Sequence, residues 1–414
     1  MLLVMFMKVE ILRFDDFGRG LCYVNDKVTF VLFSMPRDIL EIEITKVKKN
    51  YNEAKIVKII KPSENRVVPP CPYFGVCGGC AYQMLQYEKS ILEKQNNVMN
   101  YFKKNGLLVK PYIIKNDNPY NYRNKITLKI VNKKVGYFKN NSHNIIEINN
   151  CLLACNKINE VIKLIPSLNI INGEVIIRSN YKDEILIIIN TSDKIDISKI
   201  KKIKDLKGII LNNETIYKDN YFIEEVNGIK YNVTYDVFFQ VNRIVCSKMF
   251  KLAQDFVSES DRVLDLYSGV GTLGLSAAKK AKEVVGVEIN KNAVDNANAN
   301  AKLNNLTNAK FIYSDAGRIK DLDLNFNKLI VDPPRAGLSK DTIDFIKKKL
   351  PEEIMYISCD YHTQVRDLKL LNDYEITNSY ICDIFSYTYH VECIVFLHRK
   401  NGYNTQKVKQ IIDN

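Results

Sequence analysis

Residues 1–60 alternate between apolar and polar positions over short distances, and turn-forming residues separate the apolar runs. The pattern predicts strands at Leu21–Val24, Val28–Phe33, Ile39–Val47 and Ala54–Ile60. Turn signals such as Asp-Phe-Gly at 16–18 and Asn-Asp at 25–26 fall between them. Several short strands at this spacing indicate a small β-barrel as the first domain.

Residues 61–233 predict a second, β-rich domain. Prolines at positions 62, 69 and 70 interrupt the chain after the last strand of the barrel. Apolar residues at helical spacing predict an amphipathic helix over 84–102, and we leave open whether this helix packs on the domain that follows. Short β-type runs continue beyond it to about residue 229.

Residues 234–414 change to alternating strands and helices, the pattern of a parallel sheet with crossover helices. The predicted strands are Arg262–Leu266, Glu283–Val287, Lys310–Tyr313, Lys328–Val331, Ile354–Ser358, Tyr374–Asp383 and Val391–Leu397. The predicted helices are Thr272–Ala281, Asn292–Asn304, Ser339–Leu350 and Thr363–Leu370. We therefore expect a doubly wound α/β domain at the C-terminal end.

Composition fits a multidomain cytoplasmic protein without a membrane segment. The 414 residues include 60 Lys and Arg against 47 Asp and Glu, a net charge of +13. This excess suits either a solvated Lys-rich surface or a polyanionic partner. No secretory signal and no apolar run of membrane-spanning length is present. Ten cysteines in a reducing compartment are not expected to form a disulfide framework.

A glycine-rich turn follows the first strand of the α/β domain. Gly269 and Gly271 stand between a predicted strand and helix, where glycine lets a ligand approach the backbone. Glu288 follows the second strand, where a carboxylate can accept hydrogen bonds from ribose hydroxyls, and Asp315 follows the third. The turn indicates a nucleotide-type cofactor. Because Gly274 completes a G-x-G-x-x-G pattern, the motif alone also fits NAD.

Three reactive side chains follow later strands of the same sheet. Asp332 opens an Asp-Pro-Pro-Arg run, Cys359 lies in Ser-Cys-Asp, and Glu392 closes His-Val-Glu. Carbon 5 of uracil is not nucleophilic enough to take a methyl group directly, but a thiolate added to carbon 6 activates it. A base must then remove the proton at carbon 5. A Cys and a Glu in one pocket meet both needs, whereas hydride transfer needs neither.

Several segments together identify a family resemblance that covers essentially the whole chain. The motifs are FFQVN, DLYSGVGTLGL, DPPRAGL, YISCD and HVE, in this order, and they resemble the RNA uracil-5-methyltransferases. The resemblance implies that Cys359 is the nucleophile and Glu392 the base. It further implies a pocket for S-adenosylmethionine and the target base lined by Gln240, Tyr267, Gly269, Glu288, Asp315 and Asp332. Tyr361 and Ser386 depart from prolines that are usual in the family and put local loop shape in doubt.

The resemblance also assigns the three domains. Residues 1–60 resemble an OB-like TRAM barrel, 61–233 a central iron–sulfur domain, and 234–414 a Rossmann-like class I methyltransferase. Cys71, Cys77 and Cys80 are spaced as ligands of a metal site, which needs a fourth ligand, and Cys151 and Cys155 are both available. The family pattern around SHNIIEINNC selects Cys151 and implies a [4Fe–4S] cluster. Four thiolates also suit zinc.

The expected partner is RNA. Lys and Tyr are interleaved at 112–115 and 120–125, as in a groove that pairs phosphates and stacks bases, although a solvated basic strand gives the same pattern. Because family members acting on transfer RNA often lack both barrel and cluster, we expect a monomer acting on 23S ribosomal RNA. The alternatives are 5-methyluridine formation in the transfer-RNA T-loop, a base-amino RNA methyltransferase, and a non-catalytic iron–sulfur RNA-binding protein.

Overall fold

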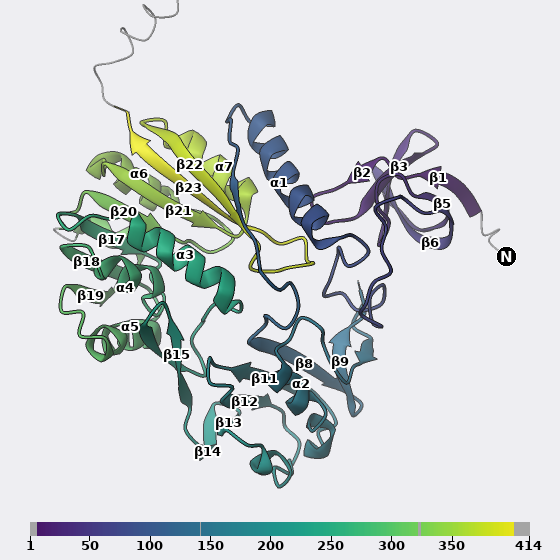
Figure 1. The fold of residues 1–414 in the computed structure, drawn as a ribbon, viewed down its shortest axis with the longest axis horizontal. Helices are drawn as coiled ribbons and strands as arrows, with labels where there is room; N and C mark the ends of the chain where they lie inside the picture. Colours follow the sequence, from purple (N-terminus) through teal and green to yellow (C-terminus); the bar gives the residue numbers. More distant parts are fainter. Residues whose placement is uncertain (1–5, 141, 322–323, 401–414) are drawn as a thin grey trace, which may run out of the picture.

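The computed structural model describes residues 6–400 apart from 141 and 322–323, and it has three lobes (Figure 1). The N-terminal lobe lies at one side, a central sheet at the bottom, and the α/β lobe at the other side. Among the described residues, no helix is long and apolar enough to span a bilayer.

The N-terminal lobe is a six-stranded sheet in the order β1-β5-β6-β4-β3-β2. Its strands are β1 (Phe6–Glu10), β2 (Arg13–Phe14), β3 (Gly20–Val24), β4 (Lys27–Val31), β5 (Ile39–Val47) and β6 (Tyr51–Lys61). Alternate side chains such as Leu40 and Ile42 are buried in its small core. Strand β4 ends before Phe33, which takes a left-handed φ of 61° in the following turn.

The central lobe is a seven-stranded sheet in the order β10-β9-β8-β11-β12-β13-β14. The strands are β8 (Lys125–Val131), β9 (Lys134–Phe138), β10 (Ile145–Glu147), β11 (Gly173–Ser179), β12 (Ile185–Asn190), β13 (Leu206–Leu211) and β14 (Glu214–Lys218). Helix α2 (Asn156–Ile162) and two short 3-10 helices, Ile165–Leu168 and Ile200–Lys202, share its Ile-rich core.

The α/β lobe contains an eight-stranded sheet in the order β19-β18-β17-β20-β21-β23-β22-β7. Its strands from this region are β17 (Arg262–Leu266), β18 (Glu283–Glu288), β19 (Ala309–Tyr313), β20 (Lys328–Val331), β21 (Glu353–Ser358), β22 (Tyr374–Cys382) and β23 (Glu392–Arg399). The helices are α3 (Arg243–Asp255), α4 (Thr272–Ala278), α5 (Lys291–Leu303), α6 (Lys340–Lys349) and α7 (Tyr361–Leu370), with a 3-10 helix at Ala316–Asp321.

This sheet is not entirely parallel, contrary to the expectation from the alternating pattern. Strands β17 to β21 pair in parallel, but β23 runs antiparallel to both β21 and β22. The physical reason is the short connection 383–391 between β22 and β23, which lacks the length of a helical crossover.

Two segments that precede the central sheet in sequence belong to the α/β lobe in space. Helix α1 (Tyr87–Lys104) buries Ile91, Val98 and Phe102 in the same core as the α/β sheet, and lies beside its last strands in Figure 1. Strand β7 (Tyr112–Ile114) pairs in parallel with β22 at the sheet edge. Most of the Tyr-Lys run at 112–115 therefore lies on an edge strand.

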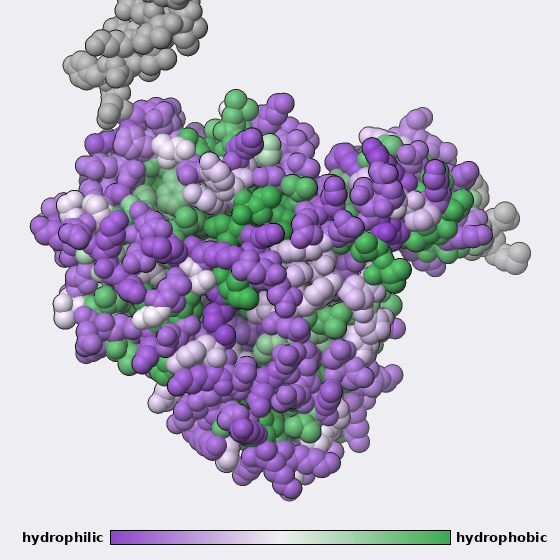
Figure 2. All heavy atoms as spheres, in the orientation of Figure 1, coloured by the Kyte–Doolittle hydropathy of each residue, from purple (hydrophilic) through white to green (hydrophobic). Residues whose placement is uncertain are grey.

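A hairpin joins the central and α/β lobes. It consists of β15 (Tyr221–Val226) and β16 (Ile229–Thr234), and its Tyr231 is completely buried in the α/β core. The backbone N–H of Asn232 donates to Asn300 of α5 at 2.6 Å. The central and α/β lobes are thus joined by packed side chains and hydrogen bonds rather than by a linker alone. In Figure 2 the visible face is mainly hydrophilic, with apolar surface gathered between α1 and α3.

Candidate active site

The turn after β17 contains three residues with positive φ, two of which are glycines. Tyr267, Gly269 and Gly271 have φ values of 62°, 53° and 84°. A Cβ at Gly271 would lie 2.7 Å from the ring of Phe311, whereas a Cβ at Gly269 would meet nothing within 4 Å. Gly271 therefore packs the turn against the sheet, and Gly269 leaves open space above it.

Two carboxylates hold this turn from below. Glu288 accepts from the backbone N–H of Gly269 at 3.0 Å and from that of Asn290 at 2.8 Å. Asp265 is fully buried and accepts from the N–H of Gly274 at 2.9 Å. Burial, aided by the negative charges of Asp332 and Glu288, raises the pKa of Asp265 to about 8.

Two of the other predicted cofactor residues share a cavity, and a third lies before helix α3. Tyr267 and Asp315 line one cavity of about 730 Å³. The Tyr267 hydroxyl lies 3.1 Å from the Thr342 hydroxyl on α6. Gln240 precedes α3, and its carbonyl accepts from the Asn124 side chain at 3.2 Å.

Cys359 and Glu392 are adjacent because their strands pair. Ser358 of β21 is opposite Cys393 of β23, so the next position on each side brings the thiol and the carboxyl together. Glu392 is only 7% exposed, while Cys359 is half-buried. Asp360 caps α7 by accepting from the backbone N–H of His362 at 2.9 Å, which fixes the chain directly after the thiol.

Burial disfavours the charged forms of Cys359, Glu392 and Asp332. Burial and the nearby Glu392 carboxyl raise the pKa of Cys359 to about 11, while Arg335 opposes the rise. Burial, followed by the charge of Asp332, raises the pKa of Glu392 well above its usual range. Burial also raises the pKa of Asp332 to about 7. Arg335 is thus the local positive charge that favours a thiolate, and sequence reasoning had given it no such role.

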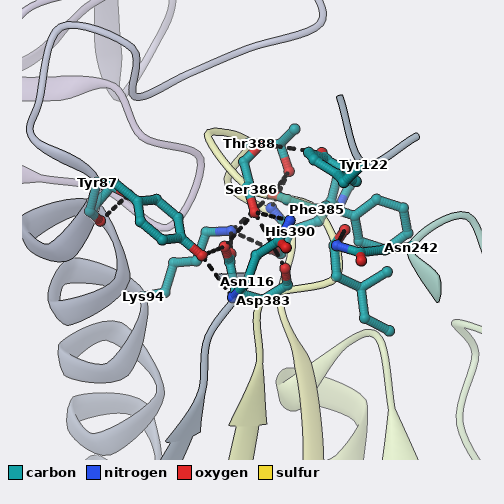
Figure 3. Close-up of polar contacts among 12 residues, drawn as sticks. Tyr87, Lys94, Asn116, Tyr122, Asn242, Asp383, Phe385, Ser386, Thr388 and His390 are labelled. Carbon is teal, nitrogen blue, oxygen red and sulfur yellow. Dashed lines mark hydrogen bonds and ion pairs between the residues drawn. The ribbon is translucent and has the colours of Figure 1, made fainter. Parts of the chain in front are cut away.

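The loop 383–391, which leads into Glu392, is held by a buried ion pair that sequence reasoning missed. Lys94 of α1 donates to Asp383 at 2.6 Å, to the carbonyl of Phe385 at 3.0 Å and to that of His390 at 2.8 Å. Figure 3 shows the lysine reaching from the helix into the loop. Lys94 and Asp383 are each 2% exposed.

Further hydrogen bonds fix the same loop from three sides. Asp383 also accepts from the hydroxyls of Tyr87 at 2.8 Å and Ser386 at 2.6 Å. Asn242, the cap of α3, donates to the carbonyl of Ile384 at 3.1 Å (Figure 3). The carbonyl of Tyr387 accepts from two backbone N–H groups at 81–82, directly after Cys80. The position of Glu392 thus depends on α1 and on the cysteine loop.

The four predicted cluster cysteines surround one cavity of about 590 Å³, lined by Cys71, Cys77, Cys80 and Cys151. Cys155, which the sequence left as an alternative, is not among the residues that line it. Burial raises the pKa of Cys80 to about 12, and the Gln83 side chain lies 3.1 Å from its sulfur. Within the described part of the chain, no three His, Cys, Asp or Glu side chains converge closely enough to hold a metal ion.

The fold is an α/β domain with a glycine turn at the edge of its sheet, joined to a central and an N-terminal β-sheet lobe. A solved structure of a Pyrococcus abyssi tRNA (uracil-54, C5)-methyltransferase matches with a TM-score of 0.78 and 24% identity, covering 94% of this chain and 100% of that one. This likeness bears on the fold alone.

Sequence comparison then fixes the family. Residues 176–400 match the tRNA (uracil-5-)-methyltransferase family and residues 6–57 match the TRAM domain. An uncharacterised RNA methyltransferase of Clostridium tetani is 32% identical, covering 92% of this chain and 93% of its own. A 23S rRNA (uracil(1939)-C(5))-methyltransferase of Francisella tularensis subsp. novicida is 30% identical, covering 95% and 96%. The chain belongs to the tRNA (uracil-5-)-methyltransferase family and is an S-adenosylmethionine-dependent RNA methyltransferase.

Proposed function

We propose that the enzyme methylates carbon 5 of a uridine in RNA through a covalent bond between the Cys359 sulfur and carbon 6. The adjacency of Cys359 and Glu392 on paired strands is the observation that carries this proposal. Bound S-adenosylmethionine supplies an electrophilic methyl group. Gln240, Tyr267, Gly269, Glu288, Asp315 and Asp332 would hold it and the uracil at the sheet edge.

Cys359, Arg335 and Glu392 would carry out the protein's part of the reaction. The Cys359 thiol would release its proton to solvent, favoured by the charge of Arg335, and the thiolate would add to carbon 6. The electron pair of the carbon 5–carbon 6 double bond would then form the bond from carbon 5 to the methyl group, while the bond from that methyl group to the sulfonium sulfur breaks and S-adenosylhomocysteine leaves. Glu392, once ionised, removes the proton from carbon 5, and the thiolate leaves as the double bond reforms. The raised pKa of Glu392 suits a base that must release this proton again.

Trapping on 5-fluorouridine RNA tests the covalent step. Fluorine at carbon 5 leaves no proton to remove, so the wild-type adduct should persist on Cys359 through denaturing electrophoresis. Cys359→Ala should form no adduct and no 5-methyluridine while still binding RNA. Cys155→Ala provides a control, because Cys155 lines neither the cavity of Cys359 nor that of the four predicted cluster cysteines. Methylation by Cys359→Ala would favour a base-amino methyltransferase. RNA binding without methylation by any variant would favour a non-catalytic RNA-binding protein.

We propose 23S ribosomal RNA as the substrate, supported by the relative from Francisella tularensis subsp. novicida. The name of the matching family favours transfer RNA as the second candidate. Mass spectrometry of ribosomal and transfer RNA from cells lacking the protein would name the missing nucleoside. Loss of 5-methyluridine from transfer RNA alone would refute the ribosomal assignment. We also infer a monomer, which sedimentation can check.

The four cysteines Cys71, Cys77, Cys80 and Cys151 would hold a [4Fe–4S] cluster. They line one cavity, and four cysteine thiolates are the usual ligands of such a cluster. The same four thiolates also suit a tetrahedral zinc ion. Anaerobically purified protein should be brown, with about four iron and four sulfide per chain. Colourless protein with one zinc would refute the cluster.

A further inference from the structure

Two cavities meet at the mouth of the active site, between the N-terminal lobe and the loop 383–391. The first, of about 140 Å³, contains Cys359 and Arg335. The second, of about 390 Å³, leads toward the cysteine loop at Gly79 and Cys80. Phe17, Tyr389 and His390 line both cavities and so form the boundary between them.

Phe17 and Tyr389 are aromatic side chains left in solvent at this boundary. Phe17 is 56% exposed and Tyr389 is 37% exposed. Their ring centroids lie 5.5 Å apart at an interplanar angle of 73°, and the His390 ring lies 4.1 Å from Tyr389. Exposed aromatic rings beside a catalytic cleft have apolar faces available to a ligand.

The loop that carries Phe17 is fixed before any ligand binds. The Asp15 carboxylate accepts from the backbone N–H groups of Phe17 at 3.0 Å and Arg19 at 2.7 Å, and forms an ion pair with Arg19. Gly18 has a φ of 73°, and a Cβ there would lie 2.9 Å from that of Ala81. The tip of this loop therefore docks against the cysteine loop.

Contacts on the catalytic side fix the other half of the boundary. Asp16 lies 3.2 Å from the imidazole of His362, on the helix that begins next to Cys359. Tyr389 belongs to the loop 383–391, and Lys94 donates a hydrogen bond to the carbonyl of the next residue, His390. Burial lowers the pKa of His390 to about 4, so its imidazole is neutral at physiological pH. Both rings are thus presented by ordered backbone.

The charges around the boundary suit a polyanion. Arg335 lies in the cavity of Cys359, and Arg19 packs its guanidinium 5.4 Å from the centre of the Phe17 ring. The two acidic side chains of the Phe17 loop are engaged, since Asp15 pairs with Arg19 and Asp16 with His362. Aromatic rings flanked by guanidinium groups are typical of surfaces that bind single-stranded nucleic acid.

We propose that Phe17 and Tyr389 form a stacking platform for the base of an RNA nucleotide adjacent to the target uridine. The proposal rests on the proposed function, and it makes the N-terminal lobe part of the active-site entrance. The neighbouring base loses a stacking partner when the uridine leaves the stack to enter the cleft, and a ring face compensates for that loss without selecting one base. The substrate would then be a single-stranded or loop segment.

Steady-state kinetics on a short RNA loop tests the platform. Phe17→Ala and Tyr389→Ala should each raise KM for RNA about 5- to 140-fold, the range expected for losing one base–aromatic stack, with a much smaller change in kcat. Tyr389→Phe should behave as wild type because the ring remains. Phe6→Ala is the matched control, since Phe6 is 53% exposed on the same lobe but lines neither cavity.

Fluorescence of 2-aminopurine separates stacking from packing. Placed on either side of the target uridine, the probe should be quenched at one position when wild-type protein binds, and Phe17→Ala or Tyr389→Ala should remove the quenching. Phe17→Leu keeps an apolar side chain without a ring, so wild-type KM and quenching in this variant would overturn the proposal. Unchanged KM in both alanine variants would also overturn it.

The two proposals fail in distinguishable ways. Quenching is measured without S-adenosylmethionine and needs only RNA binding, so it reports on the platform even in protein that transfers no methyl group. Quenching without any 5-methyluridine would refute the proposed reaction and keep the platform. Methylation without quenching at either neighbouring position would do the reverse.

Discussion

Replacing Lys94 with methionine should loosen the loop that leads to Glu392. Methionine keeps most of the side-chain volume but removes the charge and three hydrogen bonds, to Asp383 and to the carbonyls of Phe385 and His390. Removing one partner of a buried ion pair costs about 3–5 kcal/mol, because the other charge stays buried without compensation. The remaining bonds of Asp383 to Tyr87 and Ser386 place the expected loss toward the lower end.

Hydrogen exchange followed by mass spectrometry measures this loss locally, which matters because a three-lobed chain need not unfold in two states. A loss of about 3 kcal/mol corresponds to a roughly hundredfold rise in the opening of the loop. Amides of the loop 383–391 and of α1 should therefore exchange faster, and kcat should fall as Glu392 loses its fixed position. Lys89→Met is the matched control, because Lys89 is exposed on the same helix.

A double variant refines the reasoning. Adding Asp383→Asn to Lys94→Met removes the uncompensated charge, so the double variant should lose less protection than Lys94→Met alone. The reasoning would be refuted if Lys94→Met changed loop protection less than tenfold. It would also be refuted if the two substitutions acted additively, because side chains in direct contact should show coupling.

The remaining predictions concern pH and the glycine turn. The hydrogen bond to Asp16 raises the pKa of His362 above its usual 6.5. The contribution of this contact to stability is therefore complete below about pH 6.5 and is lost as pH rises through the pKa of the folded state. Protection of amides 15–19 from hydrogen exchange should fall across that window, and Asp16→Asn should abolish the pH dependence. Gly271→Ala should reduce the free energy of unfolding by about 1–3 kcal/mol and weaken S-adenosylmethionine binding in calorimetry, because alanine is strained at the φ of 84° and its Cβ meets Phe311. Gly106→Ala should lose less stability, because Gly106 also has a positive φ but an added Cβ there meets nothing within 4 Å.

The amino-acid sequence was enough to predict strands β17 to β23 and helices α4 to α7 of the α/β lobe, but not helix α3. It also predicted which residues gather at the edge of the sheet. Continuous apolar runs mark buried strands, and parallel strands direct their carboxyl ends to one edge. This is why Asp332 and Cys359, far apart in sequence, could be expected near one another. The structure places them together with Glu392, and their catalytic roles remain predictions.

The antiparallel strand β23 could not be read from the same pattern, since a buried strand looks alike in either direction. Strand β7 was missed for a related reason. Its three residues are too few for a periodic signal, and its partner β22 lies much later in the chain.

The amino-acid sequence alone was enough to predict a chemistry for this protein, namely which side chains would act as nucleophile, base and thiolate ligands, and most of the strands and helices that carry them. Only the tertiary structure decided how these parts support one another. Lysine is ordinarily a surface residue, so nothing local marks Lys94 as the buried partner of Asp383. Likewise, Phe17 and Tyr389 meet only because two lobes dock, and docking depends on surfaces formed after each lobe has folded.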